Sequence, residues 1–195
     1  MNIGMVLNGN YPLDIRVRKE AETLAKKHNV FVLCKKNKED VAFEIINSVQ
    51  VIRNIEYKSV AHEGIIDVVA AINFMHPFFK KVLPKFIEEY KIEVLHVHDL
   101  PLAKTVYNIG KKYNLKLVLD LHENYPAALK TWFSWRKNPI IRFKNNIFFS
   151  YNRWSEYEAK IVKKFDIVIA VVNEMKNRLV EQHHIEATKI IVVPN

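Results

Sequence analysis

Polar side chains follow three apolar segments of this chain, and their types could bind or activate a polar substrate. The segment LVLDLHENYP, residues 117 to 126, passes directly from apolar residues into a histidine, a glutamate and an asparagine. VLHVHDLP, residues 94 to 101, and NGNYPLDIR, residues 8 to 16, have the same character. Imidazole, carboxylate, amide and guanidinium groups are the donors and acceptors from which active sites are built. The residues singled out in this way are Asn8, Gly9, Asn10, Asp14, Arg16, His98, Asp99, His122, Glu123, Asn124 and Tyr125.

The pattern of apolar segments predicts the scaffold that must position these groups. Most of the segments are continuous rather than alternating, which is typical of strands covered on both faces. Amphipathic stretches with helical spacing lie between them. The expected strands are Ile3–Leu7, Val30–Cys34, Val49–Ile52, Val94–His98, Leu117–Leu121, Ile167–Val172 and Ile190–Val193. The expected helices lie in residues 14–28, 64–90 (two helices broken near Pro77), 101–113, 138–164 (one long helix) and 173–183.

Alternation of strands and helices predicts a parallel sheet with right-handed crossovers. We expect residues 1–195 to form a single α/β domain, a three-layer Rossmann-like fold with a mainly parallel sheet of about seven strands. Ligands of such sheets bind beyond the carboxyl ends of the strands. Since all three polar clusters follow strands, we expect them to converge on one crevice.

Several of these residues have a structural interpretation that the sequence leaves open. Asp14 could cap the first helix by accepting from free backbone N–H groups. His122 could be a structural histidine at a strand end, and Glu123 could be a surface carboxylate. Asp120, inside the strand, is more typical of a buried partner for another group than of a catalyst.

The two histidines of VLHVHD raise the question of a metal site. His96 and His98 share one face of the strand, because side chains repeat every two residues, and Asp99 follows them. No further ligand is indicated nearby, so we expect no metal. We expect His96 to be hydrogen-bonded in the core and His98 to lie at the rim.

Several nucleotide-binding and hydrolytic motifs are absent from the sequence. The chain has four glycines, and no G-x-G-x-x-G follows the first strand, which argues against a dinucleotide-dependent dehydrogenase. Neither a G-x-x-x-x-G-K-[ST] loop nor a G-x-S-x-G motif occurs. The single cysteine, Cys34, permits no internal disulfide and fits a reducing compartment.

A net charge of +9, from 30 Lys and Arg against 21 Asp and Glu, favours an anionic partner. Cations and aromatic residues are interleaved in residues 131–154, and no carboxylate occurs from position 124 to position 155. Such a segment suits a bilayer surface, single-stranded nucleic acid, or a core helix with a solvated basic face. Of these partners we expect a membrane or a lipid-linked acceptor, and no nucleic acid. The contacts expected there are Trp132, Trp135, Arg136, Lys137, Arg142 and Lys144.

The order of several motifs resembles the N-terminal domain of retaining glycosyltransferases with the GT-B architecture (glycosyl transferase group 1, family-four-like). The segments that carry the resemblance are YPLDIRVRKEAETLAKKHNVFVLC, HVHDLP, LDLHENYP, WSEYEAKIVKKFDIVIAVVNEMKNRL and KIIVVPN, which together span most of the chain. The resemblance implies an acceptor-side half of a two-domain enzyme. It also implies that the C-terminal nucleotide-sugar-binding domain is absent from this chain, and that the fragment alone is inactive.

The implied reaction transfers a sugar from a nucleotide-sugar co-substrate to an acceptor hydroxyl with retention of configuration, without metal, in polysaccharide or glycolipid synthesis. His122 matches the family histidine beside the transferred sugar, and residues 8–14 match the loop that approaches the donor phosphate and the acceptor. We therefore expect His122 and Asp14 to act in catalysis. The remaining residues singled out are expected to bind substrate: Asn8, Gly9, Asn10, Arg16, His98, Asp99, Glu123, Asn124 and Tyr125.

Two other functions remain open at this point. One is an epimerase or phosphorylase half with the same two-domain plan, and the other is a non-catalytic binding module for a small anionic ligand. The preferred interpretation is a cytoplasmic enzyme, peripheral on the inner face of the membrane, with a saccharide or lipid-linked acceptor.

Overall fold

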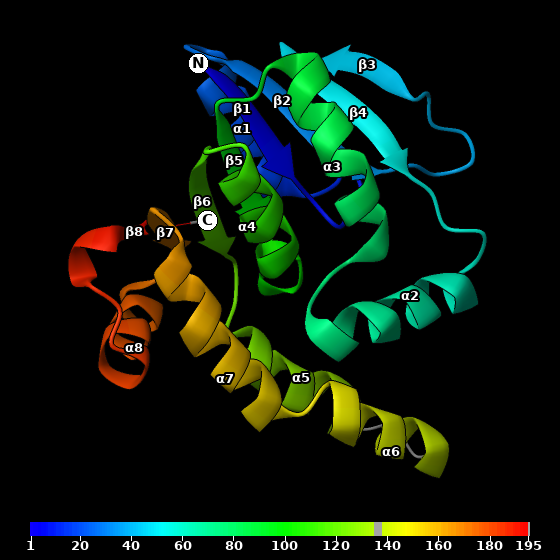
Figure 1. Cartoon of the computed structure of the whole chain (residues 1–195), viewed down its shortest axis with the longest axis vertical. Helices are drawn as coiled ribbons and strands as arrows, with labels where there is room; N and C mark the ends of the chain where they lie inside the picture. Colours follow the sequence, from blue (N-terminus) through cyan, green and yellow to red (C-terminus); the bar gives the residue numbers. More distant parts are fainter. Residues whose placement is uncertain (135–137, 195) are drawn as a thin grey trace.

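An eight-stranded sheet runs through the middle of the molecule, with helices on both of its faces (Figure 1). The structure, a computed structural model, describes residues 1–134 and 138–194. The sheet order is β3-β4-β2-β1-β5-β6-β7-β8, and every pair is parallel except β3 and β4. The strands are β1 Asn2–Val6, β2 Asn29–Lys35, β3 Phe43–Ile46, β4 Val49–Ile55, β5 Val94–His98, β6 Lys116–Leu121, β7 Ile167–Ala170 and β8 Ile190–Val192.

The sheet divides the apolar core into two parts, and helices cover the part on each of its faces. Met5 of β1 packs with Val17 of α1 on one face, whereas Val6 packs with Phe79 and Leu83 of α3 on the other. This alternation follows from the two-residue repeat of a strand. The helices are α1 Ile15–Ala25, α2 Val60–Asn73, α3 Pro77–Tyr90, α4 Ala103–Lys112, α5 Tyr125–Ser134, α6 Pro139–Phe148, α7 Tyr151–Ile161 and α8 Asn173–His183, with short 3-10 turns at Leu100–Leu102, Val162–Lys164 and Ala187–Lys189.

The order of the strands places a switch point at β1. The chain passes from β1 outward to β2 on one side, and the later strand β5 pairs with β1 on the other side. Adjacent crossovers that leave in opposite directions open a crevice at the carboxyl ends of the strands. Figure 1 shows α2, α5 and α6 gathered beyond the arrowheads of the central strands.

The predicted α/β class and mainly parallel sheet are confirmed, but three details of the prediction are wrong. The sheet has an eighth strand, β3, which pairs antiparallel with β4 through a hairpin at Asn47 and Ser48. Positive φ angles of 48° and 68° at these two residues are typical of a type I′ turn. The strand was missed because it is short and lies at the sheet edge, with its side chains partly exposed.

The segment after β6 is more broken than the sequence indicates. Residues 125–134 form α5, which was not predicted, and Asn124 caps its start by accepting from the amide of Ala127. The long helix expected within residues 138–164 is two helices, α6 and α7, separated at Phe149 and Ser150. The break lets α7 fold back along α5 (Figure 1), so that its Trp154 and Tyr157 join the core.

Candidate functional site

A cleft of about 510 Å³ lies where β1, β5 and β6 end. Each of the three strands contributes to its wall through the residues that follow it or close it, and helices α2 and α5 to α7 complete the wall. The expected convergence of the three strand ends is therefore observed. The predicted residues that line the cleft are Asn8, His98, Asp99, Glu123, Tyr125, Trp132 and Lys144.

Asp120 and His122 form a buried pair at the end of β6. The Nε2 of His122 donates to Oδ2 of Asp120 at 2.6 Å, and Nδ1 of His98 lies 3.1 Å from the same oxygen. The register of β5 and β6 pairs His98 with Asp120 directly, which explains why these side chains meet. Burial by itself lowers the pKa of His122, but the bond to Asp120 and the carboxylate charge outweigh it and raise that pKa. Burial would raise the pKa of Asp120, yet its two imidazole partners hold it well below its usual value.

Asp99 lies opposite the other nitrogen of His122, in a strained backbone conformation. Its Oδ1 is 3.6 Å from Nδ1 of His122, and its amide donates to the carbonyl of Asp120 at 2.9 Å. The φ and ψ of Asp99 are 70° and 150°, a region that residues other than glycine avoid. Burial raises the pKa of the Asp99 carboxyl. A carboxyl on a strained backbone beside a buried imidazole is typical of a functional site rather than of a scaffold.

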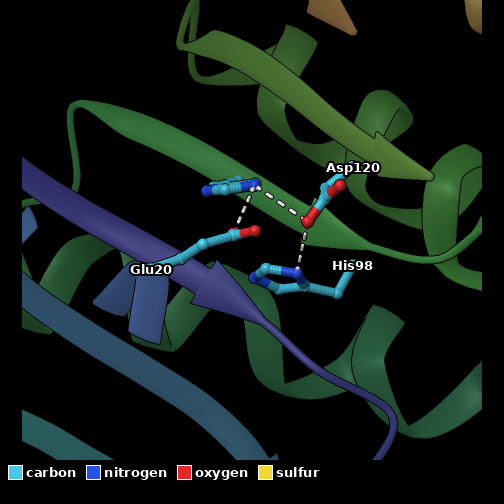
Figure 2. Close-up of side chains that lie close together, drawn as sticks. Glu20, His98 and Asp120 are labelled. Atoms are coloured by element: carbon cyan, nitrogen blue, oxygen red, sulfur yellow. Dashed lines mark hydrogen bonds and ion pairs between the residues drawn. The ribbon is translucent and has the colours of Figure 1, made fainter. Parts of the chain in front are cut away.

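Glu20 and His96 extend this group of side chains beneath the cleft. His96 Nε2 lies 3.8 Å from Oε2 of Glu20 and 3.9 Å from Oδ2 of Asp120. Figure 2 shows Glu20, His98 and Asp120 directed toward one another from α1, β5 and β6. Burial and the neighbouring Asp120 charge raise the pKa of Glu20 to about 8. Burial lowers the pKa of His96 to about 3.

The predicted placement of the two β5 histidines is right in part. His96 is buried in the core and His98 lines the cleft, as expected. His98 is nevertheless fully buried and bonded to Asp120, and Nε2 of both rings is buried without a hydrogen-bond partner. The expectation that no further ligand lies near them is wrong, because Glu20 and Asp120 approach both rings. The mistake arose because neither carboxylate is close to the histidines in the sequence.

The residues of the loop after β1, residues 8–14, lie in two different places. Oδ1 of Asn8 accepts from the hydroxyl of Tyr57 at 3.4 Å and faces the cleft, whereas Asn10 borders a separate hollow near Lys35. The Gly9 carbonyl accepts from the amide of Lys35 and so joins the loop to β2. Only Asn8 of this loop is brought to the cleft wall.

Asp14 is the N-cap of α1, as one of the two interpretations predicted. Its Oδ1 accepts from the amides of Arg16 and Val17 at 3.1 and 3.4 Å, and its Oδ2 pairs with the Arg16 guanidinium at 3.3 Å. Burial would raise the pKa of Asp14, but these donors hold it below its ordinary value. Arg16 is close enough to act electrostatically on the carboxyl groups of Asp99 and Glu123, and its charge partly offsets the burial that raises their pKa values.

The three residues after His122 have different positions. Glu123 and Tyr125 line the cleft, and burial raises the pKa of both. Asn124 is a helix cap, as described above, and is not part of the cleft wall. Tyr125 packs against Trp132 and Trp154, with ring centroids 5.7 and 4.7 Å apart.

The basic and aromatic segment contributes to the cleft as well as to the surface. Trp132 and Lys144 line the cleft, whereas Arg142 is exposed. Trp154 is buried, so this part of the segment has the core role that was one of the alternatives. The expected contacts Trp135, Arg136 and Lys137 lie outside the described residues.

Two functional candidates were missed in the sequence, Glu20 and the cleft residue His76. The sequence does indicate the position of Glu20. It follows Val17 by three positions and precedes Ala21, so helical spacing places it on the buried side of α1. His76 precedes α3, and its Nε2 lies 3.0 Å from the hydroxyl of Tyr57. No pattern in the sequence indicates that His76 would reach the cleft.

Comparison with known proteins identifies the family. The sequence profile of Glycosyltransferase Family 4 matches residues 15–195. The chain belongs to Glycosyltransferase Family 4. No curated protein matches the sequence of this Family 4 chain.

Solved structures of GT-B glycosyltransferases share the fold of this Family 4 chain. A sucrose-phosphate synthase from Thermosynechococcus elongatus matches all of the chain with a TM-score of 0.71 and 14% identity, over 48% of its own length. UGT2 of Phytolacca americana, complexed with UDP-2-fluoro-glucose and pterostilbene, matches 99% of the chain at a TM-score of 0.59 and 11% identity, over 53% of its length. The lipopolysaccharide outer core galactosyltransferase WaaB matches all of it at 0.53 and 12%, over 46%. The chain thus spans about half the length of these enzymes.

Among residues 1–134 and 138–194, no helix combines the length and the apolar character that a membrane span requires.

Proposed function

We propose that this Family 4 chain is the acceptor-binding half of a glycosyltransferase that moves a sugar from a nucleotide-sugar to an acceptor hydroxyl with retention of configuration. The observation that carries the proposal is the Asp120–His122 pair at the end of β6, beside a cleft at the switch point of the sheet. Its position supports a role for His122 next to the transferred sugar. A second, nucleotide-binding domain would close over the same edge of the sheet.

The contacts of His122 support a positioning role for its ring. Asp120 accepts from Nε2 and so fixes the ring orientation, while Nδ1 is buried without a hydrogen-bond partner and lies beside Asp99. A substrate hydroxyl that approached between Nδ1 and Asp99 would find both a nitrogen and a carboxyl group. Such pre-organised polar groups lower the barrier because they need no rearrangement as charge develops. In this proposal the leaving diphosphate takes the acceptor proton, and basic groups of the second domain offset its charge without metal.

The other cleft walls suit an acceptor with apolar or ring faces. Tyr125, Trp132 and Trp154 form a connected aromatic group on one side. Asn8 and Glu123 provide polar groups on the other side. Aromatic walls with a few polar groups are typical of small-molecule sites. This composition supports a saccharide or lipid-linked acceptor, in polysaccharide or glycolipid synthesis.

The outer surface of α2 and α6 supports a peripheral membrane location on the cytoplasmic face. These two helices pack together, and they expose Ile65, Ile72, Phe143 and Ile147. Arg142 lies next to Phe143 on the same helix and is exposed. Apolar side chains flanked by cations bind anionic bilayers through partial insertion and charge.

The central test replaces His122 by alanine in the protein together with its nucleotide-sugar-binding domain. We expect transfer to fall by about 10²-fold or more, and circular dichroism at the assay temperature checks that the variant is folded. His62→Ala on α2 is the matched control, since that histidine lies outside the site and its ring accepts only from the amide of Lys58. Full activity of the His122 variant would remove the proposed role, and the anomeric configuration of the product, measured by NMR, tests retention.

The membrane proposal has a separate test with vesicles of anionic lipid. Replacing Phe143 and Ile147 by serine should reduce co-sedimentation with vesicles about tenfold, because two apolar side chains no longer insert. Ile45→Ser, on the exposed face of β3, is the control. Equal binding by the α6 variant and the control would contradict the membrane proposal without affecting the proposed transfer.

An epimerase half remains the second candidate. A UDP-N-acetylglucosamine 2-epimerase from Rickettsia bellii shares the fold, with a TM-score of 0.52 and 10% identity over 97% of this chain. The two activities differ in their need for an acceptor. Conversion of a nucleotide-sugar to its epimer without any acceptor would favour the epimerase, whereas release of nucleoside diphosphate that depends on an acceptor would favour transfer.

A further inference from the structure

Four side chains beneath the cleft have the composition of a metal site. Glu20, His96, His98 and Asp120 each offer one ligand atom, and these atoms all lie within 4.8 Å of one another. They come from α1, β5 and β6, so three separate elements support the group. Figure 2 shows how the two carboxylates and His98 face a common centre.

The same group leaves several buried polar atoms without a hydrogen-bond partner. These atoms are Oε2 of Glu20, Nε2 of His96, Nε2 of His98 and Oδ1 of Asp120. Buried polar atoms are satisfied in nearly all proteins, and a concentration of exceptions indicates a ligand or a function. Within the described part of the chain, the ion pairs of Glu20 and Asp120 involve only histidines and no Lys or Arg. A buried carboxylate, Asp120, and a half-buried one, Glu20, therefore have no Lys or Arg partner among the described residues.

We propose that Glu20, His96, His98 and Asp120 bind one divalent transition-metal ion, for which Zn²⁺ is the best fit. Two imidazole nitrogens with two carboxylate oxygens form a donor set that suits Zn²⁺ and its first-row neighbours better than Ca²⁺ or Mg²⁺. Ligand atoms around a tetrahedral zinc lie about 3.4 Å apart. The separations are 3.1 Å from Nδ1 of His98 to Oδ2 of Asp120, and 3.9 and 3.8 Å from Nε2 of His96 to Oδ2 of Asp120 and Oε2 of Glu20. These values bracket that distance, so small side-chain movements would close a site in which the metal replaces the His98–Asp120 hydrogen bond.

Electrostatics favour a cation at this point. The carboxylates of Glu20 and Asp120 lie 3.8 and 3.9 Å from Nε2 of His96, so two acidic side chains share one small volume. A divalent cation would offset the repulsion between them.

The ion would act on the site through Asp120, and it would not touch the leaving diphosphate. Of the four ligands only His98 also lines the cleft. Asp120 accepts from Nε2 of His122, so a metal on Asp120 would fix the carboxylate that orients this imidazole. Partners of this kind behind a reactive group hold its position and tautomer. Metal binding by this chain can be measured whether or not sugar transfer is observed.

The first experiment measures metal content and affinity of the untagged chain, since a polyhistidine tag would bind zinc. We expect about one zinc per chain by mass spectrometry of metals after purification, or one saturable site when chelator-treated protein is titrated with Zn²⁺ by calorimetry. Zinc should also raise the melting temperature, because binding to the folded state alone stabilises it. Absence of retained metal together with absence of saturable binding would overturn the proposal.

Variants test which residues hold the ion. Glu20→Gln and His96→Gln should each weaken Zn²⁺ binding at least about tenfold. Glu20→Gln preserves side-chain size, and circular dichroism checks that both variants fold. His62→Gln is the control and should bind as the parent does. The visible absorption of bound Co²⁺ should report a four-coordinate site and be lost in both variants. Parent-like affinity in both folded variants would contradict the assignment.

Discussion

Two buried groups of carboxylate and histidine in this chain differ in how completely they are satisfied. Glu158 of α7 accepts from Nη1 and Nη2 of Arg178 at 2.6 and 3.1 Å, and His183 bonds to it at 2.8 Å. Both oxygens of Glu158 thus have a partner, and one partner carries a permanent charge. Asp120 instead has two histidines on one oxygen and a buried, unpartnered second oxygen.

This difference in pairing distinguishes the Glu158 group, which holds two helices together, from the Asp120 group, which keeps polar atoms available beside the cleft. The Glu158 group connects α7 with α8, far along the chain from the polar strand ends, and its residues do not line the cleft. The Asp120 group adjoins the cleft and keeps donors and acceptors available. A buried carboxylate with both oxygens paired favours one arrangement, whereas one with an unpaired oxygen has capacity to bind something else.

The largest expected effect is on the stability of the Glu158 group. Glu158→Ala should lower the free energy of unfolding by about 3–5 kcal/mol, because Arg178 would be left largely buried without its partner. Glu20→Ala, measured with chelator present, should change it by less than about 1 kcal/mol, because Oε2 of Glu20 has no hydrogen bond to lose. Urea denaturation measures both values, and a larger loss for Glu20→Ala would reverse the comparison.

A smaller effect is expected from pH. Burial would raise the pKa of Glu158, but the hydrogen bonds from His183 and Arg178 outweigh it and hold that pKa below its ordinary value of 4.5. The stabilisation is therefore present above pH 4.5 and is lost as the pH falls through the lower folded-state pKa. The difference in unfolding free energy between parent and Glu158→Gln should therefore narrow as the pH falls below 4.5. Urea titrations at each pH measure it, and a constant difference would show that the charge is unimportant.

The smallest effect concerns the backbone beside His122. Asp99→Gly should raise the free energy of unfolding by about 1 kcal/mol, because relief of the strained φ exceeds the entropic cost of a glycine. Asn114→Gly is the matched control, since its φ of 53° lies in a region that asparagine tolerates. Thermal unfolding compares the two. Equal changes would mean that the strain at the site is no greater than at an ordinary turn.

The elements of the site were predictable because local patterns specify them. Continuous apolar runs indicated β1, β5 and β6, and the polar residues after each run indicated the sheet edge where the cleft lies. Asp14 was predictable as a cap for the same reason, because its partners are two and three residues away. The edge strand β3 was not, since four partly exposed residues carry little apolar signal.

The sequence by itself determined the α/β class, the parallel sheet and the strand ends that carry chemistry, because these depend on apolar periodicity and on residues close in the chain. Only the tertiary structure decided which side chains meet there. Glu20 and Asp120 are a hundred positions apart and approach one another because α1 covers β1 while β1, β5 and β6 lie side by side in the sheet. Register paired His98 with Asp120 and left His96 unsatisfied. Strand order and register arise from long-range packing, which no local pattern of residues contains.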